Sequence, residues 1–384
     1  MDGPAVPDLA LFASLTMSLS VGIVGLPNVG KSTLFNALLK KQVAYVANFP
    51  FATIEPNVGI VPVPDPRLDQ LALIIKESER MEDLPPKVPA TVEFLDIAGL
   101  IAGAHKGEGL GNKFLAHIRE TNVVCHVLRV FTDPEIIREG SADPRSDFET
   151  VETELKLADL QTLEKQAEPK GTTSKEDAIR WRAVSKLKEA LRKGTAAREV
   201  PLDEGEQEAA RALSLLTAKP ILVALNVDEA DLKKTEESEE RYSQELGVAR
   251  NQVVTICAKT EAELADLSPE EQAAYLKELG VGESGLEKLI QRAYATLGLI
   301  NFLTAGTIEV RAWTIQKGTA AQQAAGVIHS DFEKSFIKAD VVDFETFVEV
   351  GGWQAAREQG KVRSEGKEYL VQDGEVVEFK IGAS

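Results

Sequence analysis

Residues 25–32 read GLPNVGKS, and this short stretch decides the fold. It has the spacing G-x-x-x-x-G-K-S, in which the glycines let the backbone wrap a phosphate group and point successive N–H groups at it. A β-branched run, residues 18–24, comes directly before it, and residues 31–40 after it have helical spacing. A strand, a glycine-rich loop and a helix therefore follow one another in the order that a phosphate-binding loop (P-loop) requires.

The motif also predicts what its side chains do. Lys31 reaches the β- and γ-phosphates and takes part in catalysis, and the hydroxyl of Ser32 binds Mg²⁺. The remaining phosphate contacts come from loop amides, so the predicted nucleotide-binding residues of this stretch are Asn28, Val29, Gly30, Lys31, Ser32 and Thr33. We therefore predict that the chain binds a nucleoside triphosphate with Mg²⁺.

Two elements downstream fit the same chemistry. Asp96 to Gly99 form a D-x-x-G element at the end of an apolar run, so that Asp96 holds Mg²⁺ through water and the Gly99 N–H meets the γ-phosphate. Thr53 offers a second hydroxyl ligand to Mg²⁺, although a structural turn is the alternative for its stretch. The loop at 99–111 has five glycines in thirteen residues, which suits a switch that orders around a γ-phosphate.

The rest of the chain predicts three regions. Further apolar runs at 91–95, 123–130, 221–226 and 252–256, alternating with helical stretches, predict a doubly wound α/β sheet at 17–132 and 218–300. Between them, 133–217 predicts an inserted helical hairpin or coiled coil with helices at 148–166 and 175–193. From 301 to 384 we expect a small α+β module, with strands at 307–313 and 375–381 and helices at 320–328 and 344–359. Residues 1–16 are expected to be a disordered extension.

Composition narrows the choice of partners and compartment. The net charge of −18 argues against broad nonspecific binding to nucleic acid. One basic arm, residues 175–198 from Lys175 to Arg198, holds eight Lys or Arg against three Asp or Glu, so it is either a phosphate-contacting surface or a solvated helical face. Two cysteines and no 18-residue apolar run favour a reducing cytoplasm without a membrane segment.

The P-loop and its partners resemble the YchF family of Obg-related P-loop nucleotide hydrolases. The stretches that carry the resemblance are 25–33, 48–57, 96–112 and 311–314, and it extends from about residue 17 to 382. It implies a P-loop domain, a helical hairpin and a C-terminal TGS domain of the β-grasp fold. It also implies that ATP binds at least as well as GTP. We expect the protein to be a monomer that binds the ribosome, with the basic arm and the TGS-like domain as candidate contacts.

The strand end at 226–229 predicts which base is bound. GTP-binding relatives carry N-K-x-D here, and its Asp takes two hydrogen bonds from guanine. In this chain Val227 replaces the lysine and Glu229 stands at the position of the Asp. Losing that bidentate geometry forfeits most discrimination for guanine, so ATP is favoured, with a degenerate guanine-preferring site as the alternative. Asn226 and Val227 are expected to contact the base, and Cys257 and Ala258 match the S-A-K loop that borders it.

Hydrolysis is expected to be slow. Leu100 follows D-x-x-G, where many GTPases place a water-orienting glutamine. His105 in the glycine-rich loop is one substitute, and Arg138 is another because it stands where relatives often carry a histidine. Asn28 matches the asparagine of relatives that use K⁺, so K⁺ is a candidate second ion. The sequence thus predicts a slow ATPase whose nucleotide state controls ribosome binding, with an orthodox GTPase or a nucleotide-stabilised binding protein as alternatives.

Overall fold

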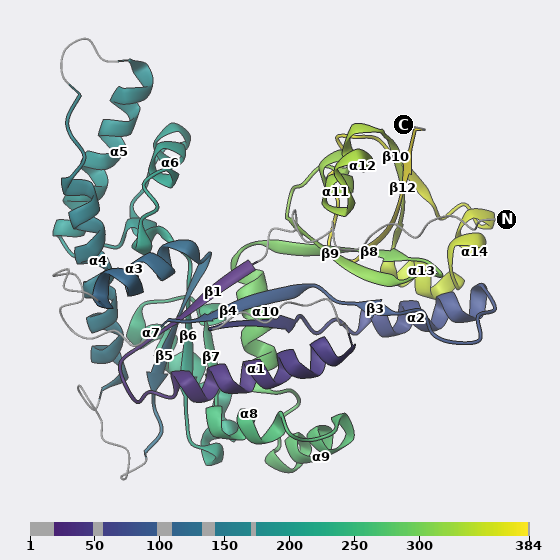
Figure 1. The fold of residues 1–384 in the computed structure, drawn as a ribbon, viewed down its shortest axis with the longest axis horizontal. Coiled ribbons are helices and arrows are strands. Elements are labelled where there is room, and N and C mark those ends of the chain that lie inside the picture. Colours follow the sequence, from purple (N-terminus) through teal and green to yellow (C-terminus); the bar gives the residue numbers. More distant parts are fainter. Residues whose placement is uncertain (1–18, 49–56, 98–109, 133–142, 170–173, 383–384) are drawn as a thin grey trace.

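The computed structural model describes residues 19–48, 57–97, 110–132, 143–169 and 174–382. Figure 1 shows a central sheet with its helices, a helical arm at one end and a second sheet at the other. The N-terminal stretch 1–16 lies outside the described residues. No helix in the described ranges is long and apolar enough to cross a membrane.

The central sheet has six strands in the order β2-β4-β1-β5-β6-β7. All neighbours run parallel except β2, which pairs antiparallel with β4 at one edge. The five predicted strands are all present, because their apolar runs are buried on both faces as a parallel sheet requires. The strands are β1 (Leu19–Val24), β2 (Val58–Pro62), β4 (Thr91–Asp96), β5 (Val123–Arg129), β6 (Ile221–Asn226) and β7 (Val253–Ile256).

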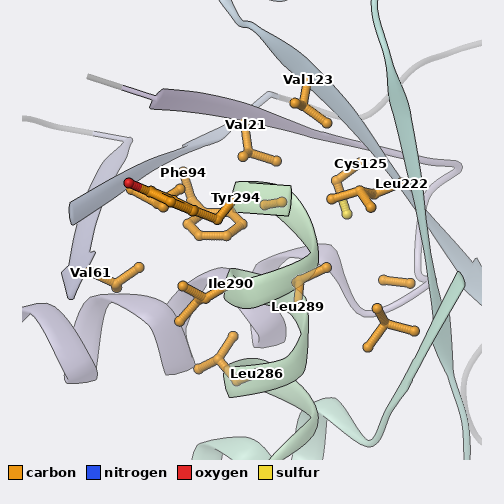
Figure 2. Close-up of a cluster of buried hydrophobic side chains, with 14 of the residues drawn as sticks. Val21, Val61, Phe94, Val123, Cys125, Leu222, Leu286, Leu289, Ile290 and Tyr294 are labelled. Carbon is orange, nitrogen blue, oxygen red and sulfur yellow. The ribbon is translucent and has the colours of Figure 1, made fainter. Parts of the chain in front are cut away.

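Helices complete the doubly wound arrangement. In Figure 2, Leu286, Leu289, Ile290 and Tyr294 of α10 point at buried side chains of the strands, among them Val21. The α-helices of this part are α1 (Lys31–Asn48), α3 (Leu110–Glu120), α7 (Thr235–Leu246), α8 (Ala258–Leu264), α9 (Pro269–Leu279) and α10 (Gly285–Thr296). Two short 3₁₀ helices, η5 (Glu229–Lys234) and η6 (Arg250–Gln252), lie in its connections.

The helical arm contains the predicted hairpin and one helix more. The hairpin helices are α4 (Pro144–Glu164) and α5 (Lys175–Arg192), within four residues of their expected bounds. A third helix, α6 (Glu204–Arg211), packs on α5, and Leu163, Leu187 and Leu213 share a small core of their own. Two 3₁₀ turns, η3 (Ala197–Glu199) and η4 (Leu216–Ala218), lead back to the sheet. The arm is therefore a three-helix unit rather than a two-stranded coiled coil.

The second sheet has the order β11-β10-β12-β8-β9-β3, in which β3 is the short strand Lys87–Val88. A parallel pair, β8 and β12, lies at its centre, each with an antiparallel partner outside, and α11 packs on β9 and β10. This is the β-grasp arrangement that the family resemblance implied. Its elements are β8 (Leu299–Ala305), β9 (Val310–Gln316), α11 (Ala321–Ile328), α12 (Ser330–Lys334), β10 (Phe336–Asp343), α13 (Phe344–Val350), α14 (Trp353–Glu358), β11 (Arg363–Glu365) and β12 (Glu375–Ile381).

One predicted helix of this module is broken in two. The expected helix at 344–359 is interrupted at Gly351 and Gly352, whose φ angles are +86° and +112°. These angles lie in the left-handed region, where glycine ends a helix without a steric penalty. The prediction of one continuous helix was therefore wrong, and the Gly-Gly pair is the reason.

A segment from the first third of the chain belongs to this second sheet. Helix α2 (Arg67–Ser78) buries Leu68, Leu71, Ala72 and Ile75, a helical stripe that packs against β8, β9 and α13. The chain then adds β3 (Lys87–Val88) to the edge of the sheet, parallel to β9. Figure 1 shows α2 lying along this sheet, away from the nucleotide-binding loop. The two sheets are thus joined twice, by the chain at 298 and by α2 with β3.

Candidate nucleotide-binding site

The phosphate loop connects β1 to α1 against the ends of two neighbouring strands. A Cβ added to Gly25 would lie 2.6 Å from the carbonyl oxygen of Val127 in β5. One added to Gly30 would lie 2.1 Å from the Nδ2 atom of Asn226 in β6. Gly30 also has a φ of +98°, in the left-handed region. Both glycines of the motif are therefore required by close contact as well as by backbone conformation.

Lys31 lies at the first turn of α1 with its ammonium group turned back onto the loop. Its Nζ atom donates to the carbonyl oxygens of Gly25 at 3.0 Å and Leu26 at 2.7 Å. Burial lowers the pKa of Lys31, and the nearby carboxylate of Asp96 partly opposes that shift. A buried ammonium with a depressed pKa is well suited to meet an added negative charge, because the charge stabilises its protonated form.

A cavity of about 680 Å³ opens beside this loop. Of the predicted nucleotide-binding residues, all but Val29 line it. Val29 is buried behind the loop instead. The lining residues are Asn28, Gly30, Lys31, Ser32, Thr33, Phe131, Thr132, Asn226, Val227, Asp228, Glu229, Cys257, Ala258 and Lys259. The loop, the end of β5, the end of β6 and the start of α8 thus meet around one space, as expected at the carboxyl edge of a parallel sheet.

Asn226 holds this edge together. Its Nδ2 atom donates to the carbonyl oxygen of Val29 at 3.0 Å, and its Oδ1 atom accepts from the N–H of Ala258 at 3.0 Å. The side chain is 5% exposed. Each end of the amide is therefore engaged by protein, so Asn226 positions the loop and the start of α8, and its contact with the base edge stays a prediction.

Two carboxylates follow Asn226, and each is bonded to neighbours at the rim of the cavity. Asp228 accepts from the N–H and the hydroxyl of Thr132, both at 3.0 Å. Glu229 accepts from the hydroxyl of Thr260 at 3.0 Å and from that of Tyr275 at 3.1 Å. Val227, which precedes the two carboxylates in the chain, is 2% exposed, and its N–H donates to the carbonyl oxygen of Ile256 at 2.9 Å.

Sequence reasoning missed Phe131 and Thr132. The Arg129 guanidinium lies 4.4 Å from the centre of the Phe131 ring, and the N–H of Phe131 donates to the Asn226 carbonyl at 3.0 Å. A signal was present, because both residues directly follow a predicted central strand, where ligand-binding side chains of such sheets gather.

Two of the three predicted Mg²⁺ ligands, Ser32 and Asp96, lie in the described ranges. Ser32 is exposed at the second residue of α1 and lines the cavity. Asp96 ends β4; burial raises the pKa of its carboxyl, and the Lys31 ammonium partly offsets this. A hydroxyl and a carboxylate are oxygen donors of the kind Mg²⁺ prefers. Within the described ranges no three His, Cys, Asp or Glu gather into a metal-binding group.

Several predicted site residues lie outside the described residues. They are the Mg²⁺ candidate Thr53 and the catalytic candidates Gly99, His105 and Arg138, together with Leu100.

Two family models match parts of this chain. A family model described as 50S ribosome-binding GTPase matches residues 20–168. A second, named YchF-GTPase_C and described as a protein of unknown function, matches residues 299–382. The two models thus match the part that carries the P-loop and the part that forms the second sheet.

Relatives match over nearly the whole chain. The ribosome-binding ATPase YchF of Bacillus subtilis is 48% identical over 371 residues, which cover 95% of this chain and 99% of that protein. The protein of the same name from Haemophilus influenzae is 47% identical and covers the same shares. The solved structure of the Schizosaccharomyces pombe YchF GTPase has a TM-score of 0.82 at 35% identity, covering 94% of this chain and 98% of that one. The chain therefore belongs to the YchF family of P-loop nucleotide hydrolases.

Proposed function

We propose that this protein is a slow, Mg²⁺-dependent ATPase of the cytoplasm that prefers ATP to GTP and whose nucleotide state controls binding to the ribosome. One observation carries the choice of base. The acidic residue that should read guanine is Glu229, and its carboxylate is bonded to Thr260 and Tyr275. Val227 stands where GTP-binding relatives carry a lysine, so neither of the usual guanine contacts is present.

The phosphate and metal contacts follow from the P-loop. Lys31 and the loop amides hold the phosphates, and Ser32, Thr53 and Asp96 are the proposed Mg²⁺ ligands, directly or through water. The ion, when bound, neutralises charge on the β- and γ-phosphates. Gly99 is proposed to sense the γ-phosphate. We also propose that K⁺ binds beside Asn28, and a comparison of the turnover rate in K⁺ and Na⁺ buffers tests this.

An orthodox GTPase is the second candidate. The family model over residues 20–168 and the solved relative from S. pombe are both described as GTPases, whereas the B. subtilis relative is described as an ATPase. Calorimetric titration with non-hydrolysable ATP and GTP analogues at one Mg²⁺ concentration distinguishes the two. We expect tighter binding of the ATP analogue, and at least tenfold tighter binding of the GTP analogue would overturn the proposal.

Slow turnover is proposed from Leu100, a residue that cannot orient a water molecule. His105 and Arg138 are the proposed sources of the missing contact. Single-turnover hydrolysis by His105→Ala and Arg138→Ala, compared with the wild type, tests both. A rate unchanged in both variants would leave neither as a catalytic group.

Ribosome binding is proposed from the names of the relatives, which are ribosome-binding ATPases. Co-sedimentation of wild type and Lys31→Ala with ribosomes, with and without ATP, tests whether the nucleotide controls it. We expect ATP to change the bound fraction of the wild type and not that of Lys31→Ala. Identical binding in every state would favour the third candidate, a binding protein that nucleotide merely stabilises.

The basic arm is a weaker candidate for ribosomal contacts than its charge count implies. Five of its eight cations form ion pairs within the chain: Arg182, Lys186, Arg192, Lys193 and Arg198. Among the described residues the other three, Lys175, Arg180 and Lys188, have no ion pair, but Arg180 donates to the Oε1 atom of Gln166 at 2.9 Å. Lys175 and Lys188 are therefore the proposed contacts. Their reversal to Glu is expected to weaken co-sedimentation, and undiminished binding would exclude the arm.

A further inference from the structure

Glu229 is held by two hydroxyl groups that come from elsewhere in the chain. Thr260 lies in α8 and Tyr275 in α9, and both donate to the Oε2 atom of Glu229. The hydroxyl of Tyr275 also lies 3.4 Å from Oε2 of Glu263. Glu229 itself begins η5, three residues after the end of β6 at Asn226.

One of the two holding groups is fixed in place. Thr260 is 2% exposed, and the start of α8 is tied to β6 by the bond from the Ala258 N–H to Asn226. The next residue, Glu261, accepts from the N–H of Gly285 at 2.7 Å, which joins α8 to α10. The position of the Glu229 carboxylate is therefore set by the packing of α8 and α9.

The held carboxylate lies at the cavity that the proposed function assigns to the nucleotide. Glu229 lines the same cavity as Val227 and Cys257, which border the predicted base site. The other nearby carboxylate, Asp228, is bonded to Thr132 and cannot replace it without losing two hydrogen bonds. Glu229 is thus the acidic group whose direction decides what the base meets.

We propose that Thr260 and Tyr275 are specificity-determining residues: by hydrogen bonding Glu229 they keep its carboxylate from pairing with guanine. Guanine presents donors at N1 and at its 2-amino group, which a released carboxylate would accept. Adenine presents an acceptor at N1, which the same carboxylate would repel. The two hydroxyls therefore disfavour GTP and favour ATP together. This inference rests on the proposed nucleotide site.

The experiment removes the two hydroxyls while keeping shape. Thr260→Val, Tyr275→Phe and the double variant are titrated with non-hydrolysable ATP and GTP analogues in Mg²⁺. The measured quantity is the ratio of the two dissociation constants, GTP analogue over ATP analogue. We expect the double variant to lower this ratio about tenfold, the effect of one hydrogen bond to a charged group. Each single variant should lower it less.

Matched controls separate the proposed effect from a general one. Thr296→Val and Tyr242→Phe delete the same groups away from Glu229 and should leave the ratio unchanged. Adding Glu229→Ala to the double variant should restore the wild-type ratio, because no carboxylate is left to be released. Thermal unfolding of each variant establishes that it is folded before titration.

Two results would overturn the inference. One is a ratio in the double variant within twofold of the wild type. The other is a lowered ratio that stays equally low after Glu229→Ala is added to the double variant. The effect of the two hydroxyls would then not depend on the carboxylate. A wild type that prefers GTP would defeat the proposed function instead, and the change of the ratio on releasing Glu229 would still be measurable.

Discussion

Asn226 donates a hydrogen bond of 3.0 Å to the backbone carbonyl of Val29, so that the end of β6 holds the phosphate loop in place. Asn226→Ala removes this bond and the one to Ala258, each worth roughly 1–3 kcal/mol when a buried partner is left unpaired. We expect both ATP and GTP analogues to bind at least tenfold more weakly, with little change in their ratio, as measured by calorimetry. A changed ratio with retained affinity would show that Asn226 reads the base after all.

The close approach at Gly30 gives a second prediction. Gly30→Ala places a Cβ 2.1 Å from Asn226 Nδ2 and must push the loop and the strand end apart. Gly194 has a similar φ of +86°, but an added Cβ there meets nothing within 4 Å. Both variants carry the backbone strain of roughly 1–2 kcal/mol, so the difference between them isolates the contact. Nucleotide binding should be lost in Gly30→Ala and kept in Gly194→Ala. Equal binding by both variants would contradict the idea that Gly30 must lie close to Asn226.

Acid stability should depend on a buried carboxylate at the base of the helical arm. Glu152 Oε2 lies 2.6 Å from Arg198 Nη2, and Oε1 lies 3.2 Å from Nε2 of His126 in β5. Burial raises the pKa of Glu152, but His126 and Arg198 outweigh it and lower the pKa from 4.5 to about 2. The folded state then binds fewer protons than the unfolded state, so this stabilisation is complete above pH 4.5 and is lost as the pH falls toward 2.

Glu152→Gln tests this contribution by chemical unfolding at several pH values. At pH 7 we expect the free energy of unfolding to fall by roughly 3–5 kcal/mol, since a charge partner is removed from a buried pair. The gap from the wild type should narrow below pH 4.5. Glu149→Gln breaks an exposed pair with Arg145 and should cost much less, because solvent screens that pair. Parallel pH curves for wild type and Glu152→Gln would argue against the assignment.

The basic arm offers two lysines with different expected effects. The Nζ atom of Lys186 lies 2.7 Å from Oε2 of the fully buried Glu206, which also pairs with Arg182. Lys188, in contrast, has no ion pair among the described residues. Lys186→Glu sets two carboxylates against each other between α5 and α6 and should lower the thermal unfolding midpoint by several degrees. Lys188→Glu should leave that midpoint nearly unchanged. A similar midpoint for both variants would mean that the pair at Glu206 does not hold the two helices together.

The sequence predicts the nucleotide-binding part of the fold well because the rules there are local. The P-loop needs glycine where a Cβ would strike Val127 or Asn226, and the parallel strands need continuous apolar runs. The surface charge of the helical arm was harder to predict. The count of charges at 175–198 does not show that Glu206, from a later helix, pairs with cations of this stretch. Phe131 and Thr132 carry no motif of their own and enter the site only because β5 ends beside β6.

Long-range pairing accounts for the other omissions. The stripe from Leu68 to Ile75 is a helical pattern, but no local rule indicates that it packs on strands that begin near residue 299. Glu229 illustrates the same limit within the site. The sequence shows that the guanine-reading residue is altered, whereas the hydroxyls that hold it come from two later helices.

The packing of α2 has a consequence for synthesis of the chain. The strands that cover its apolar stripe, β8 and β9, are made roughly 230 residues after α2 itself. At a rate of synthesis of about 5–20 residues per second, α2 is made roughly 10–45 seconds before β8 and β9. During that interval Leu68, Leu71, Ala72 and Ile75 are without their final cover. The nascent protein must therefore keep this helix in solution, or shielded by something else, until its last module is translated.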